Sequence, residues 1–284
     1  MRAAILEGQN GRVLALVARA SPAVATAPDV ILLHAEALQQ LGRVSEAASM
    51  LQTLVGRAVS GSAPAWLPGA STLLGDGDLA QGHPAAAEIH FRHSLDLLGV
   101  HGDRQSSGLA WRGLGIAQAM RNDFDGAEAS YLQARLELQP IGDRLLLARI
   151  TDGLGYITAS QGRLADALLL YQQAAAMGSA FGSNETELGS RLNMAAAHGY
   201  LLQHAVALEQ LRALLPRIRQ IDYPTMSRFG LATYANALAE TGAFTEARRQ
   251  LAQLDADRQP HDETNAVVDV RIDEARVRYA IGDA

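Results

Sequence analysis

The sequence repeats a pattern of small and bulky residues every forty positions, and this period constrains the fold more than any other feature. In each repeat an alanine lies four residues before a bulky residue and twelve residues after a glycine or alanine. A fixed period of this length is typical of arrays in which each repeat buries its apolar face against its neighbours. The three series are Ala47, Ala87, Ala127, Ala167, Ala207 and Ala247; Leu51, Phe91, Tyr131, Tyr171, Leu211 and Leu251; and Ala35, Gly75, Gly115, Gly155, Ala195, Ala235 and Ala275.

Each repeat has the pattern of two helices joined by a tight turn. Apolar residues recur at helical spacing, and no segment alternates apolar and polar residues with the period of a strand. The turn residue readily takes the left-handed conformation that ends a helix, except at Leu202, where we expect an irregular turn. The turn positions are Gly42, Gly82, Asn122, Gly162, Leu202 and Gly242.

Between repeats, a helix stop is followed directly by a helix start. A glycine that can end one helix precedes an Asp or Ser that can cap the next. We therefore predict an all-α solenoid. The three clearest stop-and-start pairs are Gly102-Asp103, Gly142-Asp143 and Gly182-Ser183.

One repeat carries a nearly complete signature of a known helical motif. The signature consists of Trp111, Leu114, Gly115, Phe124, Ala127, Tyr131 and Ala134, and the next repeat keeps Leu154, Gly155, Gly162, Ala167, Tyr171 and Ala174. These residues resemble the tetratricopeptide repeat (TPR) family, and the resemblance extends over nearly the whole chain. The forty-residue period is similar to the longer-helix repeats of MalT-like bacterial regulators and LGN-type scaffold proteins. The resemblance implies a right-handed superhelical solenoid that binds proteins or peptides.

We expect a single solenoid over residues 1–284, made of six antiparallel helix pairs. A partial unit is expected at residues 1–20 and a charged capping helix at residues 264–281, because repeat arrays need solvated ends. The six predicted units are residues 28–61, 66–101, 103–141, 143–181, 184–221 and 224–258.

Composition excludes several classes of function. The 24 basic residues, all arginine, face 30 acidic residues, so the net charge of −6 does not favour nucleic acid or anionic membranes as partners. The absence of cysteine excludes disulfides, thiolate metal sites and cysteine nucleophiles. Glu7 and Arg12 interrupt any apolar signal sequence near the start, so the predicted location is the cytoplasm.

Catalytic and metal-binding motifs are weak. Glu88, His90 and His93, with Asp96 nearby, have a spacing that metal ligands use, but the repeat places both histidines on the solvent side. Gly75-Asp76-Gly77-Asp78 lacks the acid spacing of a calcium loop. His198 and His204 are interpreted as hydrogen-bonded turn histidines. We predict no enzymatic activity, no metal and no cofactor.

The candidate site is the groove that the first helices of the repeats would line. Arginines there can bind carboxylates, amides can bind a peptide backbone, and aromatic rings offer rigid apolar area. Asn193 precedes Met194-Ala195, where peptide-binding TPR proteins carry an asparagine that holds the ligand backbone. The candidate residues are Arg112, Arg149, Asp152, Tyr156, Asn193, Tyr200, Phe229, Thr233 and Asn236.

We therefore predict a module that binds a protein or an extended peptide with an acidic end, as the interaction or sensor region of a bacterial regulatory protein. The alternative is a structural scaffold that self-associates into a homo-oligomer and has no groove ligand. That alternative would depend on apolar residues of the last helix, such as Val267, Val268 and Ile272.

Overall fold

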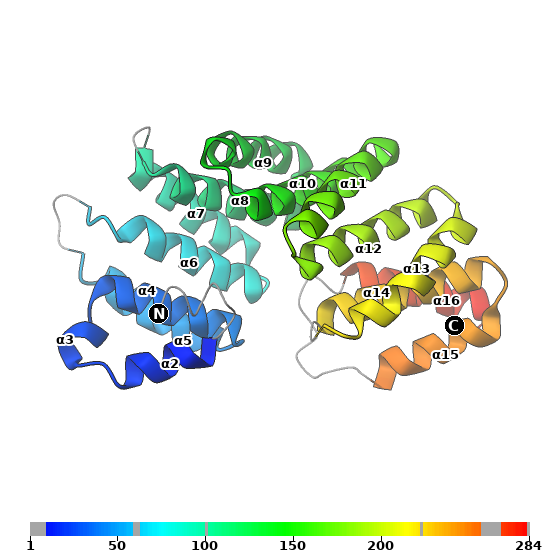
Figure 1. The fold of residues 1–284 in the computed structure, drawn as a ribbon, viewed down its shortest axis with the longest axis horizontal. Helices are drawn as coiled ribbons and strands as arrows, with labels where there is room; N and C mark the ends of the chain where they lie inside the picture. The colour runs from blue at the N-terminus through cyan, green and yellow to red at the C-terminus, as the bar shows by residue number, and fades with distance from the viewer. Residues whose placement is uncertain (1–9, 59–62, 100–101, 222–223, 257–267, 283–284) are drawn as a thin grey trace. The chain divides into compact units, whose positions relative to one another are not determined.

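The chain is a helical solenoid of the predicted class. The computed structural model describes residues 10–58, 63–99, 102–221, 224–256 and 268–282, and every regular element within these ranges is a helix. The contacts between helices divide the chain into two compact units, Met1–Ile141 and Gly142–Ala284. Figure 1 shows that each unit is built from antiparallel helical hairpins arranged in series.

The first unit contains three long hairpins and shorter helices at its N-terminal end. In each hairpin the two helices pack against each other, and in the first two hairpins the second helix also packs against the first helix of the following hairpin, while the three first helices touch in sequence order. Val13 of the N-terminal helix is buried against Ala37, which closes that end of the core. The elements are α2 (Asn10–Ala18), α3 (Pro22–Ala25), α4 (Pro28–Gln40), α5 (Val44–Val55), α6 (Leu67–Ala80), α7 (Pro84–Leu98), α8 (Arg104–Met120), α9 (Phe124–Leu138) and the 3₁₀ turn η2 (Gln139–Ile141).

The second unit follows the same plan and ends in a single helix. Its first helices, the last helix included, contact one another in sequence order, so their inner faces form one continuous surface. Val277 and Ile281 of the last helix join the core of this unit. The elements are α10 (Arg144–Ser160), α11 (Leu164–Ala180), α12 (Asn184–Tyr200), α13 (His204–Ile218), α14 (Pro224–Glu240), α15 (Phe244–Ala256) and α16 (Val268–Ile281).

The last helix is the predicted capping helix, and its C-terminal carbonyl is held by a neighbour. Arg248 of α15 donates a hydrogen bond from Nη2 to the backbone oxygen of Ile281, 2.8 Å away. Val267, which the scaffold alternative invoked, lies outside the described residues, as do the side chains of Val268 and Ile272. Within the described ranges no helix combines the length and the apolarity needed to cross a bilayer.

The core of each hairpin is a contact between a small residue on the first helix and a bulky one on the second. Where the bulky residue is aromatic, the small one is glycine. A Cβ atom added at Gly75 would lie 2.8 Å from the ring of Phe91, and one added at Gly155 would lie 2.7 Å from the ring of Tyr171. In the hairpin of Ala35, the facing bulky residue is the smaller Leu51, and both are fully buried. The repeated sequence pattern therefore reflects the steric fit between the small residue on the first helix and the bulky residue on the second.

The turn inside each hairpin ends the first helix with a left-handed residue. Gly162 has a φ of 82°. The Arg163 amide donates a hydrogen bond to the carbonyl oxygen of Thr158, which is the 6→1 bond of a Schellman motif. Leu202 was expected to break this rule, and that expectation is wrong. Leu202 has a φ of 60°, and the Gln203 amide donates the corresponding hydrogen bond to the carbonyl oxygen of His198. The turn therefore has the regular geometry, although leucine disfavours the left-handed conformation that it takes there.

The predicted N-caps of α8, α10 and α12 are confirmed, whereas the glycine predicted to end α7 is corrected. The side chains of Asp103, Asp143 and Ser183 each accept a hydrogen bond from a backbone amide in the first turn of α8, α10 and α12. Gly142 and Gly182 take positive φ values as expected, but Gly102 does not. The glycine with a positive φ after α7 is Gly99, at 54°, and its ψ of −162° is extended rather than left-handed helical.

The glycine–aromatic contact predicts a coupled effect on stability. Gly155→Ala should lower the free energy of unfolding by about 1–2 kcal/mol, because overpacking outweighs the gain of about 1 kcal/mol in helix propensity. In the background of Tyr171→Leu the same change should no longer destabilise. Chemical denaturation of the four proteins of this double-mutant cycle measures the coupling.

Gly199→Ala is the matched control, since Gly199 lies in α12 with no atom within 4 Å of an added Cβ. That variant should be neutral or slightly stabilised. Equal effects of Gly155→Ala with and without Tyr171 would show that the ring does not set the spacing of the helices.

The strained turn predicts a stabilising substitution. Leu202 is 79% exposed, so Leu202→Gly removes little packing and relieves a left-handed conformation that costs about 1–2 kcal/mol for most residues. We expect a net gain of up to about 1 kcal/mol after the larger entropy of unfolded glycine. Thermal unfolding provides the measurement. Leu136→Gly is the control, because Leu136 is 58% exposed inside α9 and its loss should destabilise by about 1 kcal/mol.

Candidate functional site

Two adjoining pockets open on the inner face of the second unit. The larger one, here called the apolar pocket, has a volume of about 510 Å³ and is lined by residues of α10, α11, α12 and α14 and of the turn that joins α10 to α11. The smaller one, here called the polar pocket because the charged residues Glu240 and Arg276 are part of its lining, has a volume of about 200 Å³ and lies among α12, α13, α14 and α16. Tyr200 and Ala196 line both pockets, so the two are neighbours along the same face.

The apolar pocket gathers several of the predicted groove residues. Tyr156 of α10, Asn193 and Tyr200 of α12, and Phe229 of α14 all line it. Tyr156 and Tyr200 are 43% and 45% exposed, so their rings are available to a ligand rather than consumed by the core. Met226 also lines this pocket, although the sequence analysis did not single it out. Aromatic rings and a flexible thioether around a concave surface are typical of sites that bind apolar side chains.

Asn193 is held in place by Asp152. The Asn193 Nδ2 atom donates to the two carboxylate oxygens of Asp152 at 3.2 and 3.3 Å, and Ser190 Oγ donates to Oδ1 at 2.7 Å. Burial raises the pKa of the Asp152 carboxyl, and the hydrogen bonds from Ser190 and Asn193 act in the opposite direction. The prediction of Asp152 as a ligand contact stays a prediction, and its hydrogen bonds give it the geometry of a residue that orients Asn193.

The helix that carries Asn193 is anchored by a buried carboxylate. Glu187 of α12 accepts two hydrogen bonds from the Arg217 guanidinium, at 3.0 and 3.1 Å, and one from Arg191 at 3.0 Å. The bonds from Arg217 are the main reason that the pKa of Glu187 is lowered. A bidentate arginine pair fixes geometry as well as charge. The contact therefore ties α12 to α13 beside the pocket.

Tyr200 connects the two pockets and is covered by a cation. The Arg276 guanidinium of α16 lies 5.7 Å from the centroid of the Tyr200 ring, within the range of a cation–π contact. Arg276 also lines the polar pocket. Arg276 was not predicted from the sequence, although the repeat contained a signal for it. Arg276 directly follows the small residue Ala275, as Tyr156 follows Gly155 and Asn236 follows Ala235.

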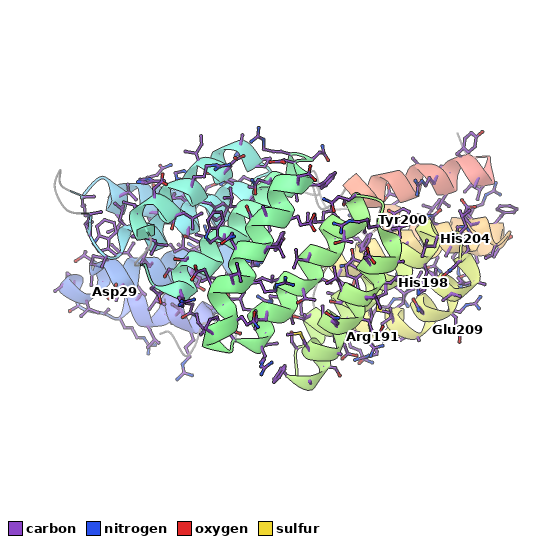
Figure 2. All side chains as sticks on the ribbon, turned by 90° about the horizontal axis from the view of Figure 1, so that it is seen from above. Asp29, Arg191, His198, Tyr200, His204 and Glu209 are labelled. Carbon is purple, nitrogen blue, oxygen red and sulfur yellow. The ribbon has the colours of Figure 1, made fainter. Side chains whose placement is uncertain are left out.

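The polar pocket collects three predicted groove residues, Tyr200, Thr233 and Asn236, with residues that were not predicted as ligand contacts. Figure 2 shows Tyr200, His198 and His204 close to the turn between α12 and α13. The expectation of hydrogen-bonded turn histidines is correct for His198, whose Nδ1 lies 2.7 Å from Gln203 Oε1. It is wrong for His204, whose buried Nδ1 has no hydrogen-bond partner among the described residues. His204 lines the polar pocket.

The two predicted groove arginines lie near acidic residues of the protein itself. Arg149 of α10 approaches Glu185 of α12, with 3.5 Å between Nη2 and Oε2. Arg112 belongs to the first unit, where its charge acts on the half-buried Asp76 of α6. Neither arginine lines the apolar or the polar pocket.

The acidic and histidine motifs form no metal cluster in the described part of the chain. His93 is exposed, whereas His90 is half-buried with Nε2 3.6 Å from Asp78 Oδ2. Glu88 is instead paired with Arg92 and Arg121. Gly75 to Asp78 lie inside α6 rather than in a loop. No group of three or more His, Asp or Glu side chains among the described residues has an arrangement that could hold a metal ion.

The fold is that of solved TPR proteins. A signal transduction ATPase with a tetratricopeptide repeat sensor from Pyrococcus horikoshii is 17% identical with a TM-score of 0.66, covering 90% of this chain and 39% of that one. A Rap protein complexed with Competence and Sporulation Factor is 13% identical with a TM-score of 0.66, covering 90% and 73%. NprR with its cognate peptide NprX is 10% identical with a TM-score of 0.62, covering 84% and 68%. No protein-family model and no curated protein matches the sequence.

The Asp76 carboxyl of α6 predicts a pH-dependent stability. Burial and the nearby charge of Glu36 raise the pKa of Asp76 to about 6, while Arg112 acts to lower it. Between the ordinary value of 3.8 and about 6 the unfolded chain releases this proton first, so raising the pH favours unfolding. Asp76→Asn should therefore become more stable than the wild type as the pH rises through this window, by up to about 3 kcal/mol.

Urea denaturation of both proteins between about pH 4 and pH 8 gives the difference in the free energy of unfolding directly, because the titration of all other groups contributes equally to the two proteins. The pKa of Asp76 can be followed by NMR. A stability difference that does not change with pH would show that the carboxyl is hydrated like a surface acid.

Proposed function

We propose that the second unit of this TPR-like solenoid binds an extended peptide segment along its inner face, without catalysis. The observation that carries the proposal is the apolar pocket, which places two exposed tyrosines beside an asparagine held in one orientation. Apolar pockets with a few fixed polar groups are the usual form of a binding site. The pocket would take an apolar side chain of the peptide, and the amide would hold its backbone.

The rings of Tyr156, Tyr200 and Phe229 supply the affinity in this proposal. Each has few rotatable bonds, so a ligand that covers them gains contact area with little loss of conformational entropy. They come from three successive first helices, α10, α12 and α14. A peptide in contact with all three would therefore be extended rather than folded.

Asn193 supplies the orientation. An amide side chain has two N–H donors and an acceptor oxygen, so the bonds to one carboxylate do not exhaust it. Because Asp152 holds the Nδ2 end, the amide does not have to lose rotational freedom when a ligand binds. Preorganisation of this kind favours recognition of a peptide group, which carries one donor and one acceptor per residue.

The structural neighbours support the same class of ligand. NprR is solved with its cognate peptide, and a Rap protein is solved with Competence and Sporulation Factor. The archaeal neighbour uses its repeats as a sensor. Since a shared fold does not carry function by itself, these likenesses add weight only through the pocket described above. We accordingly propose that the chain is the interaction or sensor region of a bacterial regulatory protein.

A peptide selection tests this proposal. A random library of linear peptides with free ends would be selected on the full chain, and the affinity of the best peptide measured by calorimetry. Tyr156→Ala and Asn193→Ala should each weaken binding about 10- to 100-fold, as expected for central interface residues.

Tyr279→Ala is the matched control, because Tyr279 of α16 is highly exposed and lines neither pocket. Circular dichroism would verify that each variant keeps its helices. If no peptide is enriched, or if all three variants bind the selected peptide equally, the groove proposal is wrong. In that case, concentration-dependent self-association of the wild-type chain, measured by analytical sedimentation, would favour the scaffold alternative.

A further inference from the structure

The apolar pocket follows a single helix, α12, over about three turns. Gly189, Asn193, Ala196 and Tyr200 of this helix line the pocket at intervals of four, three and four residues, so they form one stripe of the helix. The stripe is about 16 Å long, because each residue of a helix rises by 1.5 Å. The pocket is therefore an elongated trough with α12 as its floor.

The floor is open at Gly189, where the neighbouring repeats carry large residues. Arg149 of α10 and Phe229 of α14 occupy the same repeat position, forty residues to either side. Packing does not require a glycine here, since an added Cβ atom would make one close contact in the described part of the chain, with Met226 Cε at 3.4 Å. A glycine inside a helix costs about 1 kcal/mol relative to alanine. Gly189 thus lowers helix stability and leaves open space, here called the glycine gap, beside Met226.

A second gap opens at Ala196, seven residues further along the same face of α12. The neighbouring repeats carry Tyr156 and Asn236 at this position. Tyr200, four residues on, is the helical neighbour of Ala196 and also lines the pocket. This space beside Tyr200 is here called the alanine gap. The two gaps lie about 10.5 Å apart along the helix axis.

The distance between the gaps favours one backbone conformation of an extended ligand. In a β-strand, side chains on one face recur every second residue, at about 7 and 13 Å. Polyproline II has three residues per turn and a rise of 3.1 Å, so side chains on one face lie about 9 Å apart. The polyproline II spacing is nearer to the distance between the gaps. A segment in this conformation would place side chains three residues apart in the two gaps.

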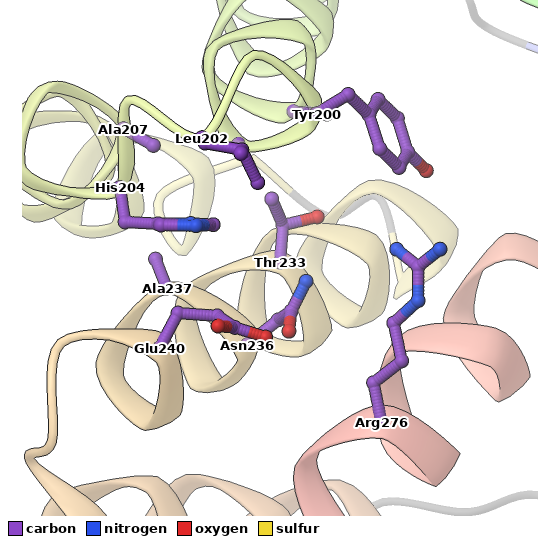
Figure 3. Close-up of a pocket in the computed structure, with 11 residues that line it drawn as sticks. Tyr200, Leu202, His204, Ala207, Thr233, Asn236, Ala237, Glu240 and Arg276 are labelled. Atoms are coloured by element: carbon purple, nitrogen blue, oxygen red, sulfur yellow. The ribbon is translucent and has the colours of Figure 1, made fainter. Parts of the chain in front are cut away.

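The lining of the trough suits proline rings. None of the described residues that line it carries a charged side chain. Arg276 faces the Tyr200 ring, but Figure 3 shows it among the residues of the adjoining polar pocket, and it does not line the trough. Grooves lined by aromatic side chains are the usual receptors of polyproline II segments, which lose little conformational entropy on binding.

Asn193 supplies the kind of hydrogen bond that such a segment needs. A polyproline II chain makes no internal hydrogen bonds, and its prolines have carbonyl oxygens but no N–H. A receptor must therefore offer donors. The Asn193 amide nitrogen carries two N–H groups, and the bonds to the Asp152 carboxylate fix its position. Asn193 lies between the two gaps, four residues after Gly189 and three before Ala196.

We propose that the apolar pocket binds a proline-rich segment in the polyproline II conformation, with prolines three residues apart in the glycine and alanine gaps and a carbonyl between them on Asn193. This inference rests on the proposed function and adds the chemical class of the peptide and the spacing of its anchors. It requires no free end, so an internal segment of a partner protein would bind.

Two peptides with blocked ends test the spacing. One consists of four Pro-Ala-Ala repeats, with prolines three residues apart. The other consists of six Pro-Ala repeats, which gives the same length and more proline but no pair at that spacing. Ligand-observed NMR titration with the full chain should give a dissociation constant below about 1 mM for the first peptide and about ten-fold weaker binding for the second.

Gly189→Leu tests the place of binding, because the leucine side chain would fill the glycine gap. It should weaken binding of the Pro-Ala-Ala peptide by about ten-fold or more, while the helix is retained because leucine has the higher helix propensity. Gly11→Leu is the matched control, since Gly11 lies in α2 of the first unit with no described atom within 4 Å of an added Cβ. It should leave the affinity unchanged.

Circular dichroism would verify that both variants keep their helices. The proposal is overturned if the two peptides bind equally, because that result would show only a general affinity for stiff chains. It is also overturned if the Pro-Ala-Ala peptide does not bind at about 1 mM, or if Gly189→Leu and Gly11→Leu bind it alike.

The peptide selected from the library separates this inference from the proposed function. If that peptide has no prolines three residues apart and loses affinity with Tyr156→Ala, while the Pro-Ala-Ala peptide does not bind, the groove proposal stands and the proline inference fails. If neither the library nor the Pro-Ala-Ala peptide gives binding, both fail.

Discussion

The close contact between a helix backbone and a bulky side chain is the constraint on which the rest of this structure depends. At Gly75 and Gly155 an aromatic ring occupies the space that any Cβ atom would need. The ring can lie there only if the two helices of the hairpin approach closely, which sets their separation and their rotation about their axes. Because the same contact recurs in each hairpin, it determines which face of each first helix is turned inward.

The position of the site follows from that rotation. Tyr156 and Asn236 each come directly after a small contact residue, Gly155 and Ala235, and both line a pocket on the inner face. A residue next to a buried helix position lies about 100° around the helix, at the edge of the packed stripe. Groove residues are therefore placed by the packing of the core, and the binding surface and the stability of the unit share one geometric cause.

Local structure was predicted best from the sequence where a single type of side chain satisfies a single physical requirement. The caps at Asp103, Asp143 and Ser183 were predictable because a side-chain oxygen must satisfy free amides at a helix start. The turn at Leu202 was not, since the backbone hydrogen bonds of the turn, from the amides of Leu201, Leu202 and Gln203, and the packed helices on either side hold a leucine in a conformation it disfavours. Its neighbour His204 was misjudged for the related reason that hydrogen-bond partners across helices cannot be read from a turn sequence.

The sequence by itself determined the all-α class, the forty-residue unit, the two helices of each hairpin and the inward position of Tyr156, Asn193, Tyr200 and Phe229. These features depend on steric size and helical period, which are local and repeat in register. Only the tertiary structure decided that Asp152 orients Asn193, that Arg276 covers Tyr200, and that the two pockets adjoin. Those contacts join residues 41 to 76 positions apart, and their distances depend on how successive hairpins stack, a sum of small rotations that no local pattern encodes.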